Sequence, residues 1–177
     1  DGDGWVLDGM KRWNSGLHHA THDIIFARTS GKRGSPKGIT AFLVPTDAPG
    51  FRVEFFWWTF NMPTDHAEVS LNAVRVPDEA VFGPVDDGLA LAQHFVHENR
   101  IRQAASSLGA AQYCIDEAVK YANLRVTWGK RLSLNQGIQF PLVELHTEAA
   151  MLRWLIRYTA DQLDRRAALA VTHLVAM

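Results

Sequence analysis

Before residue 85 the chain consists of short apolar and aromatic runs separated by Gly, Pro, Ser, Asn and Asp. These runs are rich in β-branched and aromatic side chains, and they predict strands at residues 23–29, 38–45, 51–58 and 67–77. Two shorter runs, 5–7 and 10–12, flank Asp8-Gly9, a dipeptide that favours a two-residue hairpin turn because both positions tolerate positive φ. Short antiparallel strands at this spacing predict a β barrel or sandwich.

From residue 88 the apolar positions recur at intervals of three and four, with many alanines and no proline until Pro141. This period predicts one long helix up to Gly129 and a second that begins near Asn135, and helices of such length need a bundle to bury them. The predicted fold is therefore α+β in segregated halves. An antiparallel β barrel or sandwich domain (residues 1–84) precedes the start of an incomplete up-down helical bundle (residues 85–177).

Composition excludes several classes of protein. Of 177 residues, 47% are hydrophobic and 21% are charged, and the formal net charge of −1 argues against a nucleic-acid-binding protein. A single cysteine, Cys114, favours a reducing, cytoplasmic location. No run reaches the roughly 18 apolar residues of a membrane span. The chain begins without methionine inside a predicted strand and stops inside a helical pattern, so we expect it to be part of a longer protein.

Four stretches, in unbroken order, resemble one family. They are GDGWVLDGMKRWNSG, AEVSLNAVRVPDEAVFG, ENRIRQAASSLGAAQYCIDEAVKYANLRVTWGK and NQGIQFPLVEL. The chain resembles the acyl-CoA dehydrogenases, flavoproteins that oxidise the α,β bond of an acyl-CoA thioester. Trp128 stands where this family usually has phenylalanine. The resemblance implies the family's middle β domain followed by the first part of its C-terminal helical domain.

The resemblance implies that one end of an FAD molecule lies on the β domain. Trp13, Asn14 and Ser15 match the positions where the family places the flavin ring. A planar ring favours an aromatic wall, and a hydroxyl or amide near the ring nitrogen N5 orients the atom that accepts hydride. On local sequence alone, these residues are equally a strand end followed by turn residues.

The other end of FAD is implied at the connection between the helices. Arg125, Val126 and Thr127 match positions that contact the adenosine diphosphate part, in many members on a neighbouring subunit, and Asn135 and Gln136 match the start of the next helix. Arginine offers several donors to pyrophosphate oxygens, and the exposed N–H groups of a helix start favour anions. The alternative is a solvated helix end whose cations favour the helix dipole.

The resemblance also implies that His97 and Arg100 face the acyl-CoA, although His97 replaces a frequent aspartate. The alternative is a surface helix in which Glu98 and Arg100 form a pair. No catalytic residue is assigned, because the carboxylate base that most members use would lie beyond Met177. Asn99 matches the position of the base in a minority of members, but an amide cannot accept a proton. Taken alone, the chain is therefore expected to be inactive.

The predicted parent protein binds FAD, oxidises an acyl-CoA, passes electrons to an electron-transferring flavoprotein and forms a homo-oligomer, either a dimer or a tetramer. Two alternatives stay open: a relative with oxidase or hydroxylase flavin chemistry, and a non-catalytic binding or assembly module. The histidines of LHHATH, residues 17–22, are expected to bind no metal, because no nearby Cys or carboxylate completes a site.

Overall fold

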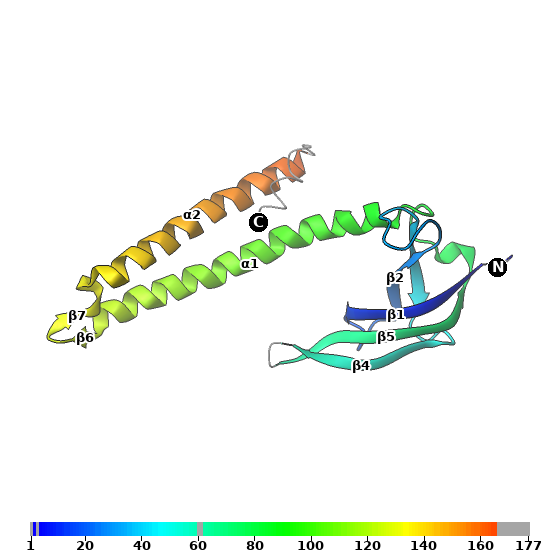
Figure 1. Cartoon of the computed structure of the whole chain (residues 1–177), viewed down its shortest axis with the longest axis horizontal. Coiled ribbons are helices and arrows are strands. Elements are labelled where there is room, and N and C mark those ends of the chain that lie inside the picture. Colours follow the sequence, from blue (N-terminus) through cyan, green and yellow to red (C-terminus); the bar gives the residue numbers. More distant parts are fainter. Residues whose placement is uncertain (1, 3, 60–61, 166–177) are drawn as a thin grey trace. The chain divides into compact units, whose positions relative to one another are not determined.

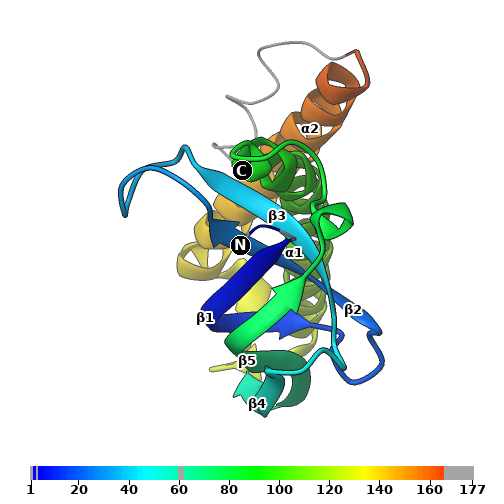
Figure 2. The ribbon, with the colours of Figure 1, turned by 90° about the vertical axis from the view of Figure 1, so that its right-hand side faces the viewer.

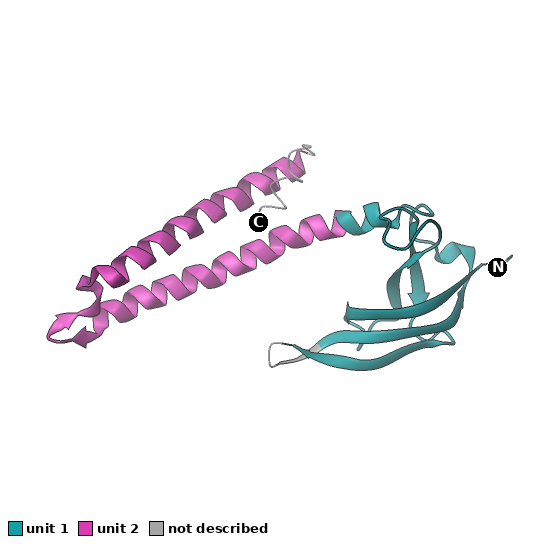
Figure 3. Cartoon of the chain, viewed as in Figure 1, with its two compact units in different colours: residues 1–93 teal, residues 94–177 magenta. Residues whose placement is uncertain are grey.

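The computed structural model describes residues 2, 4–59 and 62–165. It divides the chain into two compact units, residues 1–93 and 94–177 (Figure 3). The first unit holds five antiparallel strands, and the second holds most of one long helix together with a second long helix. The predicted order of an antiparallel β domain followed by helices is confirmed.

The strands of the first unit form two sheets (Figure 1). Their bounds are β1 Trp5–Ser15, β2 His22–Arg28, β3 Ile39–Pro45, β4 Phe51–Thr59 and β5 Met62–Val76. One sheet has the order β1-β5-β4, and the other pairs β2 with β3. Every pairing is antiparallel, and among the described residues the two sheets do not close into one barrel.

The hairpin predicted at Asp8-Gly9 is wrong, because β1 runs through this dipeptide without turning. The register of β1 with β5 shifts between Leu7 and Gly9, where Asn72 and Ala73 of β5 lie opposite Asp8 alone, which marks a bulge in β5. Gly9 has a φ of 142°, and the Asp8 Oδ1 atom accepts a hydrogen bond of 2.7 Å from the backbone N–H of Ala73 on the paired strand. Glycine inside a strand often marks a bulge, and here the pairing with a distant strand decides between bulge and turn.

The core of the β unit lies between its two sheets. Its ten buried side chains come from β1, β2, β3, β5 and the loop after β1, and Phe42, Val44, Val69 and Val74 among them are fully buried. The β2–β3 pair runs across the direction of β1 and β5 (Figure 2). The sheets therefore bury one face of each strand, and the alternation in the sequence follows from this packing.

The helical unit is an antiparallel pair connected by a short hairpin. A 3₁₀ turn, Asp78–Ala80, follows the last strand of the β unit, and α1 extends over Gly88–Leu124. The connection consists of β6 (Val126–Thr127), β7 (Lys130–Arg131) and a 3₁₀ turn at Leu132–Leu134, after which α2 covers Gln136–Asp164. No helix in the described part of the chain has the length and apolar character that crossing a membrane requires.

A narrow apolar seam holds the two helices together. It consists of Ala104, Leu108 and Ile115 on α1 and Ala149 and Ile156 on α2. These positions recur at helical spacing on one face of each helix, as predicted for an amphipathic helix. Beside the seam, the Arg153 Nη2 atom of α2 donates a hydrogen bond of 3.0 Å to Gln112 Oε1 of α1.

Candidate functional site

At the end of β1, a bulge exposes Trp13. The register with β5 shifts between Arg12 and Asn14, so that Trp13 is an extra residue in the strand, and its φ is 69°. A left-handed conformation is uncommon for a bulky residue, and a bulge re-aims the side chains beside it. Trp13 is 54% exposed. The strand therefore ends with a planar apolar surface that faces solvent.

Two aromatic side chains of β4 extend this surface. The Trp13 and Trp57 rings lie 4.8 Å apart between centroids at 40°, and Phe55 meets Trp57 edge-on at 4.6 Å. Phe56 packs against the core, whereas Phe55 is 44% exposed and Trp57, at a register shift of β4, is half-buried. We call Trp13, Phe55 and Trp57 the aromatic wall. A planar ligand could lie against such a surface.

Asn14 makes a hydrogen bond within the β unit. Its Nδ2 atom donates to Asp23 Oδ2 at 2.5 Å, and the Lys11 Nζ atom nearby donates to the carbonyl oxygen of Phe26 at 2.5 Å. Burial raises the pKa of Asp23, although hydrogen bonds from Asn14 and Ile24 and the charge of Lys11 oppose this shift. Burial lowers the pKa of Lys11, against the attraction of Asp23. The Asn14 amide therefore contacts a half-buried carboxyl group, and its predicted flavin contact stays a prediction.

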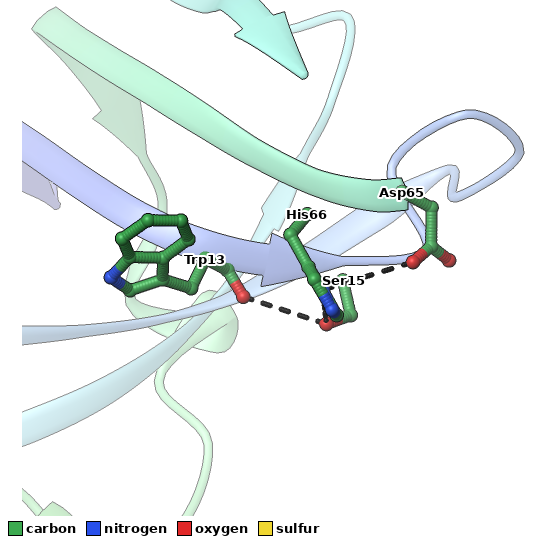
Figure 4. A network of polar contacts seen from close by, with 4 residues as sticks. All are labelled: Trp13, Ser15, Asp65 and His66. Atoms are coloured by element: carbon green, nitrogen blue, oxygen red, sulfur yellow. Dashed lines mark hydrogen bonds and ion pairs between the residues drawn. The ribbon is translucent and has the colours of Figure 1, made fainter. Parts of the chain in front are cut away.

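Ser15, the last residue of β1, contacts a histidine that the sequence did not single out. Its Oγ atom lies 2.6 Å from His66 Nδ1 and 3.5 Å from the carbonyl oxygen of Trp13 (Figure 4). Asp65 Oδ1 lies 3.8 Å from the same ring nitrogen. His66 is the cross-strand partner of Ser15 on β5. Only this pairing, between residues distant in sequence, could have identified His66.

The second group of predicted flavin residues lies where α1 ends. Arg125 directly follows the helix, and Val126 and Thr127 form β6, whose register places Val126 opposite Arg131 and Thr127 opposite Lys130. The two-residue turn is Trp128-Gly129, with φ values of 53° and 76°, as a type I′ turn requires. Trp128 is fully exposed. Gly129 permits the turn, as the sequence indicated, but the turn belongs to a small β hairpin.

Asn135 and Gln136 begin α2, as predicted. Asn135 is its N-cap residue, and its Oδ1 atom accepts a hydrogen bond of 2.8 Å from the backbone N–H of Gly137. Such a cap satisfies one of the unpaired N–H groups of the first turn. Gln136 is exposed at the first helical position. Arg125, Thr127, Asn135 and Gln136 therefore all lie at the connected end of the helical pair, within a short stretch of chain.

His97 and Arg100 lie on α1, far from that end. His97 lines a groove of about 390 Å³ between the two helices, together with Glu98 and Ile101 of α1 and Leu163 and Asp164 of α2. Arg100 is exposed and does not line this groove. The 25 residues between Arg100 and Arg125 correspond to about 37 Å along a helix. The structure thus separates the predicted substrate residues from the predicted diphosphate residues.

Two other predictions concern metal and acid–base chemistry. Among the described residues, no group of three or more His, Cys, Asp or Glu side chains is placed to hold a metal ion. In the LHHATH segment, the His18 ring stacks on Phe56 at 3.7 Å between centroids. Asn99 is half-buried on α1 and Glu98 beside it is exposed. Successive helical residues differ by about 100° in direction, so Glu98 cannot take the place of Asn99.

Comparison with known proteins identifies the family of this two-unit fold. The family model described as "Acyl-CoA dehydrogenase, middle domain" matches residues 1–74. The model described as "Acyl-CoA dehydrogenase, C-terminal domain" matches residues 86–177. The chain therefore belongs to the acyl-CoA dehydrogenase family, whose members are FAD-dependent flavoprotein oxidoreductases. The resemblance found in the sequence is confirmed.

Three individual proteins illustrate the match. Acyl-CoA dehydrogenase FadE12 of Mycobacterium tuberculosis is 29% identical over 93% of the chain, which covers 42% of that protein. The mitochondrial short-chain specific acyl-CoA dehydrogenase of Rattus norvegicus is 34% identical over 87% of the chain, covering 38% of that protein. The structure of butyryl-CoA dehydrogenase from Megasphaera elsdenii aligns with a TM-score of 0.83 at 28% identity, covering 97% of this chain and 45% of that one. The chain thus spans about two fifths of the length of the curated relatives that it matches.

Proposed function

We propose that the whole protein is an FAD-dependent acyl-CoA dehydrogenase that oxidises the α,β C–C bond of an acyl-CoA thioester. Membership of the family supports this class of reaction. In the structure, the observation that most supports a flavin site is the exposed Trp13 ring, which packs on Trp57 and lies two residues before the exposed Ser15. Bound FAD would supply the acceptor for the hydride that leaves the β-carbon.

The residues of the β unit fit one face of a flavin ring. Trp13 offers a planar apolar surface and Ser15 a hydroxyl, and both residues are exposed near the end of β1. Their proposed roles are to orient the ring and to exclude water from one of its faces. The proposed role of Asn14 is to hold this end of β1 in place, because its amide donates a hydrogen bond to the half-buried Asp23.

The residues at the connected end of the helical pair would bind the diphosphate end of FAD. Arg125 offers a guanidinium to the pyrophosphate, Thr127 adds a hydroxyl, and Asn135 and Gln136 bring the N-terminus of α2 to the same region. His97 and Arg100 would face the acyl-CoA. The roughly 37 Å between Arg100 and Arg125 along a helix supports a homo-oligomer in which each chain contributes to two flavin sites.

The remaining parts of the proposal concern the whole protein. The base that removes the α-proton is expected outside residues 1–177, because the amide of Asn99 cannot accept a proton. The electrons would pass to an electron-transferring flavoprotein, and the proposed location is the cytoplasm. Without the missing base, the chain taken alone is proposed to be inactive.

Bound flavin in the purified whole protein tests this function. We expect a yellow protein whose flavin absorbance is bleached by an acyl-CoA under anaerobic conditions without any other reductant. The matched control is the same sample with free coenzyme A, which lacks the acyl group and should bleach nothing. A colourless protein that takes up no added FAD would favour a binding or assembly module. A yellow protein that no acyl-CoA bleaches would favour other flavin chemistry.

A further inference from the structure

Ser15, His66 and Asp65 form a small polar cluster beside the aromatic wall. Ser15 ends β1 and His66 is its partner on β5, so the two side chains lie side by side across the antiparallel pair. One ring nitrogen of His66, Nδ1, makes both contacts, with Ser15 Oγ at 2.6 Å and with Asp65 Oδ1 at 3.8 Å (Figure 4). His66 is half-buried, whereas Ser15 and Asp65 are exposed.

The cluster has the residue types of a serine hydrolase triad but not its geometry. In a triad the histidine stands between the other two residues, taking the serine proton on one nitrogen while the carboxylate holds the other. Here Ser15 and Asp65 share Nδ1, so His66 cannot relay a proton between them. The geometry excludes a nucleophilic Ser15 activated in this way and leaves a positioning role for the histidine.

The carboxylate determines which atom of the Ser15–His66 contact is the donor. A negative charge 3.8 Å from Nδ1 favours a proton on Nδ1 over one on Nε2. With that proton, Nδ1 donates to Ser15 Oγ. A serine hydroxyl has one proton of its own and two acceptor sites, so an Oγ atom that accepts from His66 still has its proton to donate.

Among the described residues, the Ser15 hydroxyl has one weak alternative acceptor. The carbonyl oxygen of Trp13 lies 3.5 Å from Oγ, at the outer limit of a hydrogen bond. A better acceptor on the solvent side, next to the exposed Trp13 ring, would therefore capture the proton. The flavin ring carries such acceptors, namely its nitrogen and carbonyl groups.

We propose that His66 is a positioning residue: it donates its Nδ1 proton to Ser15 Oγ and thereby directs the Ser15 hydroxyl proton toward the ring of FAD. This inference rests on the proposed function. The oxidised ring would accept this hydrogen bond at N5, but N5 bears a hydrogen once the ring has taken hydride and then no longer accepts it. The bond from Ser15 would therefore favour binding of the oxidised ring over the reduced one. His66 acts on the flavin only through Ser15.

The test compares His66→Leu, which removes the donor, with His66→Asn, whose amide nitrogen takes the approximate place of Nδ1. In the FAD-loaded whole protein we expect His66→Leu to lower the preference for oxidised over reduced flavin roughly tenfold, the size of one hydrogen bond. The readout is the midpoint potential measured against a reference dye. His66→Asn should restore most of the preference, and His66→Leu should add nothing in a Ser15→Ala background. An unchanged potential in His66→Leu, or full additivity with Ser15→Ala, would overturn the proposal.

A second measurement does not depend on FAD. The ¹⁵N resonances of His66 in the flavin-free protein show which ring nitrogen bears the proton, with the missing signal in His66→Asn as the assignment. We expect a protonated Nδ1, and a bare Nδ1 would overturn the proposal. If the protein retains no FAD, the proposed function fails by itself. The histidine spectrum then still decides whether His66 donates to Ser15.

Discussion

The β unit and the helical unit bury their apolar side chains to different degrees. The β unit has ten buried core residues, several of them fully inaccessible, such as Phe42 and Val69. Among the described residues, the apolar cluster between the helices has five, each still 6–9% exposed. Two stacked sheets bury a whole face each, whereas two helices bury only one stripe each. The β unit therefore buries its core side chains more completely than the helical pair does, and the helical pair leaves apolar side chains such as Trp154 and Phe140 exposed for the proposed assembly.

The largest expected effect tests this difference in packing. Phe42→Ala removes a fully buried ring and should lower the free energy of unfolding by about 3–5 kcal/mol, whereas Ile156→Ala in the thin helical seam should cost about 2 kcal/mol. Denaturant unfolding of the whole protein, with hydrogen exchange to locate the loss of protection, measures both values. The matched controls are the exposed neighbours Leu43→Ala and Met151→Ala. An equal or larger cost for Ile156→Ala would contradict the contrast between the two interiors.

The second prediction concerns what each unit contributes to the flavin site. Arg125→Ala should weaken FAD retention roughly 10- to 100-fold, because a hydrogen bond to a charged group contributes about 1.5–3 kcal/mol. Lys130→Ala is the matched control, since Lys130 is an exposed cation on the partner strand of the same hairpin. Equilibrium dialysis of the flavin measures both. Equal, small effects would remove Arg125 from the proposed diphosphate site and restrict flavin binding to the β unit.

The sequence predicted the individual strands and helices better than the way in which the strands pair. Period and composition were enough for the strands and the two long helices, because each element shows its own periodicity. The bulge opposite Asp8 was missed because it lies in β5, at Asn72 and Ala73, far along the chain. His66 was missed for the same reason, since its contact with Ser15 crosses 51 residues. Local patterns predict elements, but the register between distant strands determines which side chains meet.

The predicted site residues also differ in origin. Trp13, Ser15 and Arg125 came from resemblance to a family, and no spacing in the sequence alone distinguishes them from turn or helix-end residues. The structure adds a physical reason for Trp13, namely a bulge that exposes the ring beside Trp57. For Arg125 it adds position only, directly after α1. The flavin role of both residues stays a prediction.

The smallest expected effect concerns two half-buried titratable groups of the β unit, Asp23 and Lys11. Burial raises the pKa of Asp23 above its ordinary value of 3.8. Between that value and the raised pKa, the folded protein holds a proton that the unfolded chain has lost, so the free energy of unfolding falls as the pH rises through this window. At alkaline pH, Lys11 changes the free energy of unfolding in the opposite direction. Burial lowers its pKa from 10.5, so the unfolded chain holds the extra proton there and stability rises with pH.

Asp23→Asn should therefore remove this pH dependence of the free energy of unfolding at acid pH. The variant keeps a side-chain oxygen that can accept a hydrogen bond from Asn14. We expect the stability of the wild type relative to this variant to increase as the pH falls from neutral to below 3.8, by an amount that partial exposure of the pair keeps small. Urea unfolding at a series of pH values measures the difference, and Asp47→Asn, at an exposed position of the same unit, is the control. Parallel stability curves for wild type and Asp23→Asn would show that solvent reaches Asp23 freely. In that case the Asn14 amide would be hydrogen-bonded to a solvated carboxylate. The burial that characterises the core of the β unit would then not extend to the end of β1.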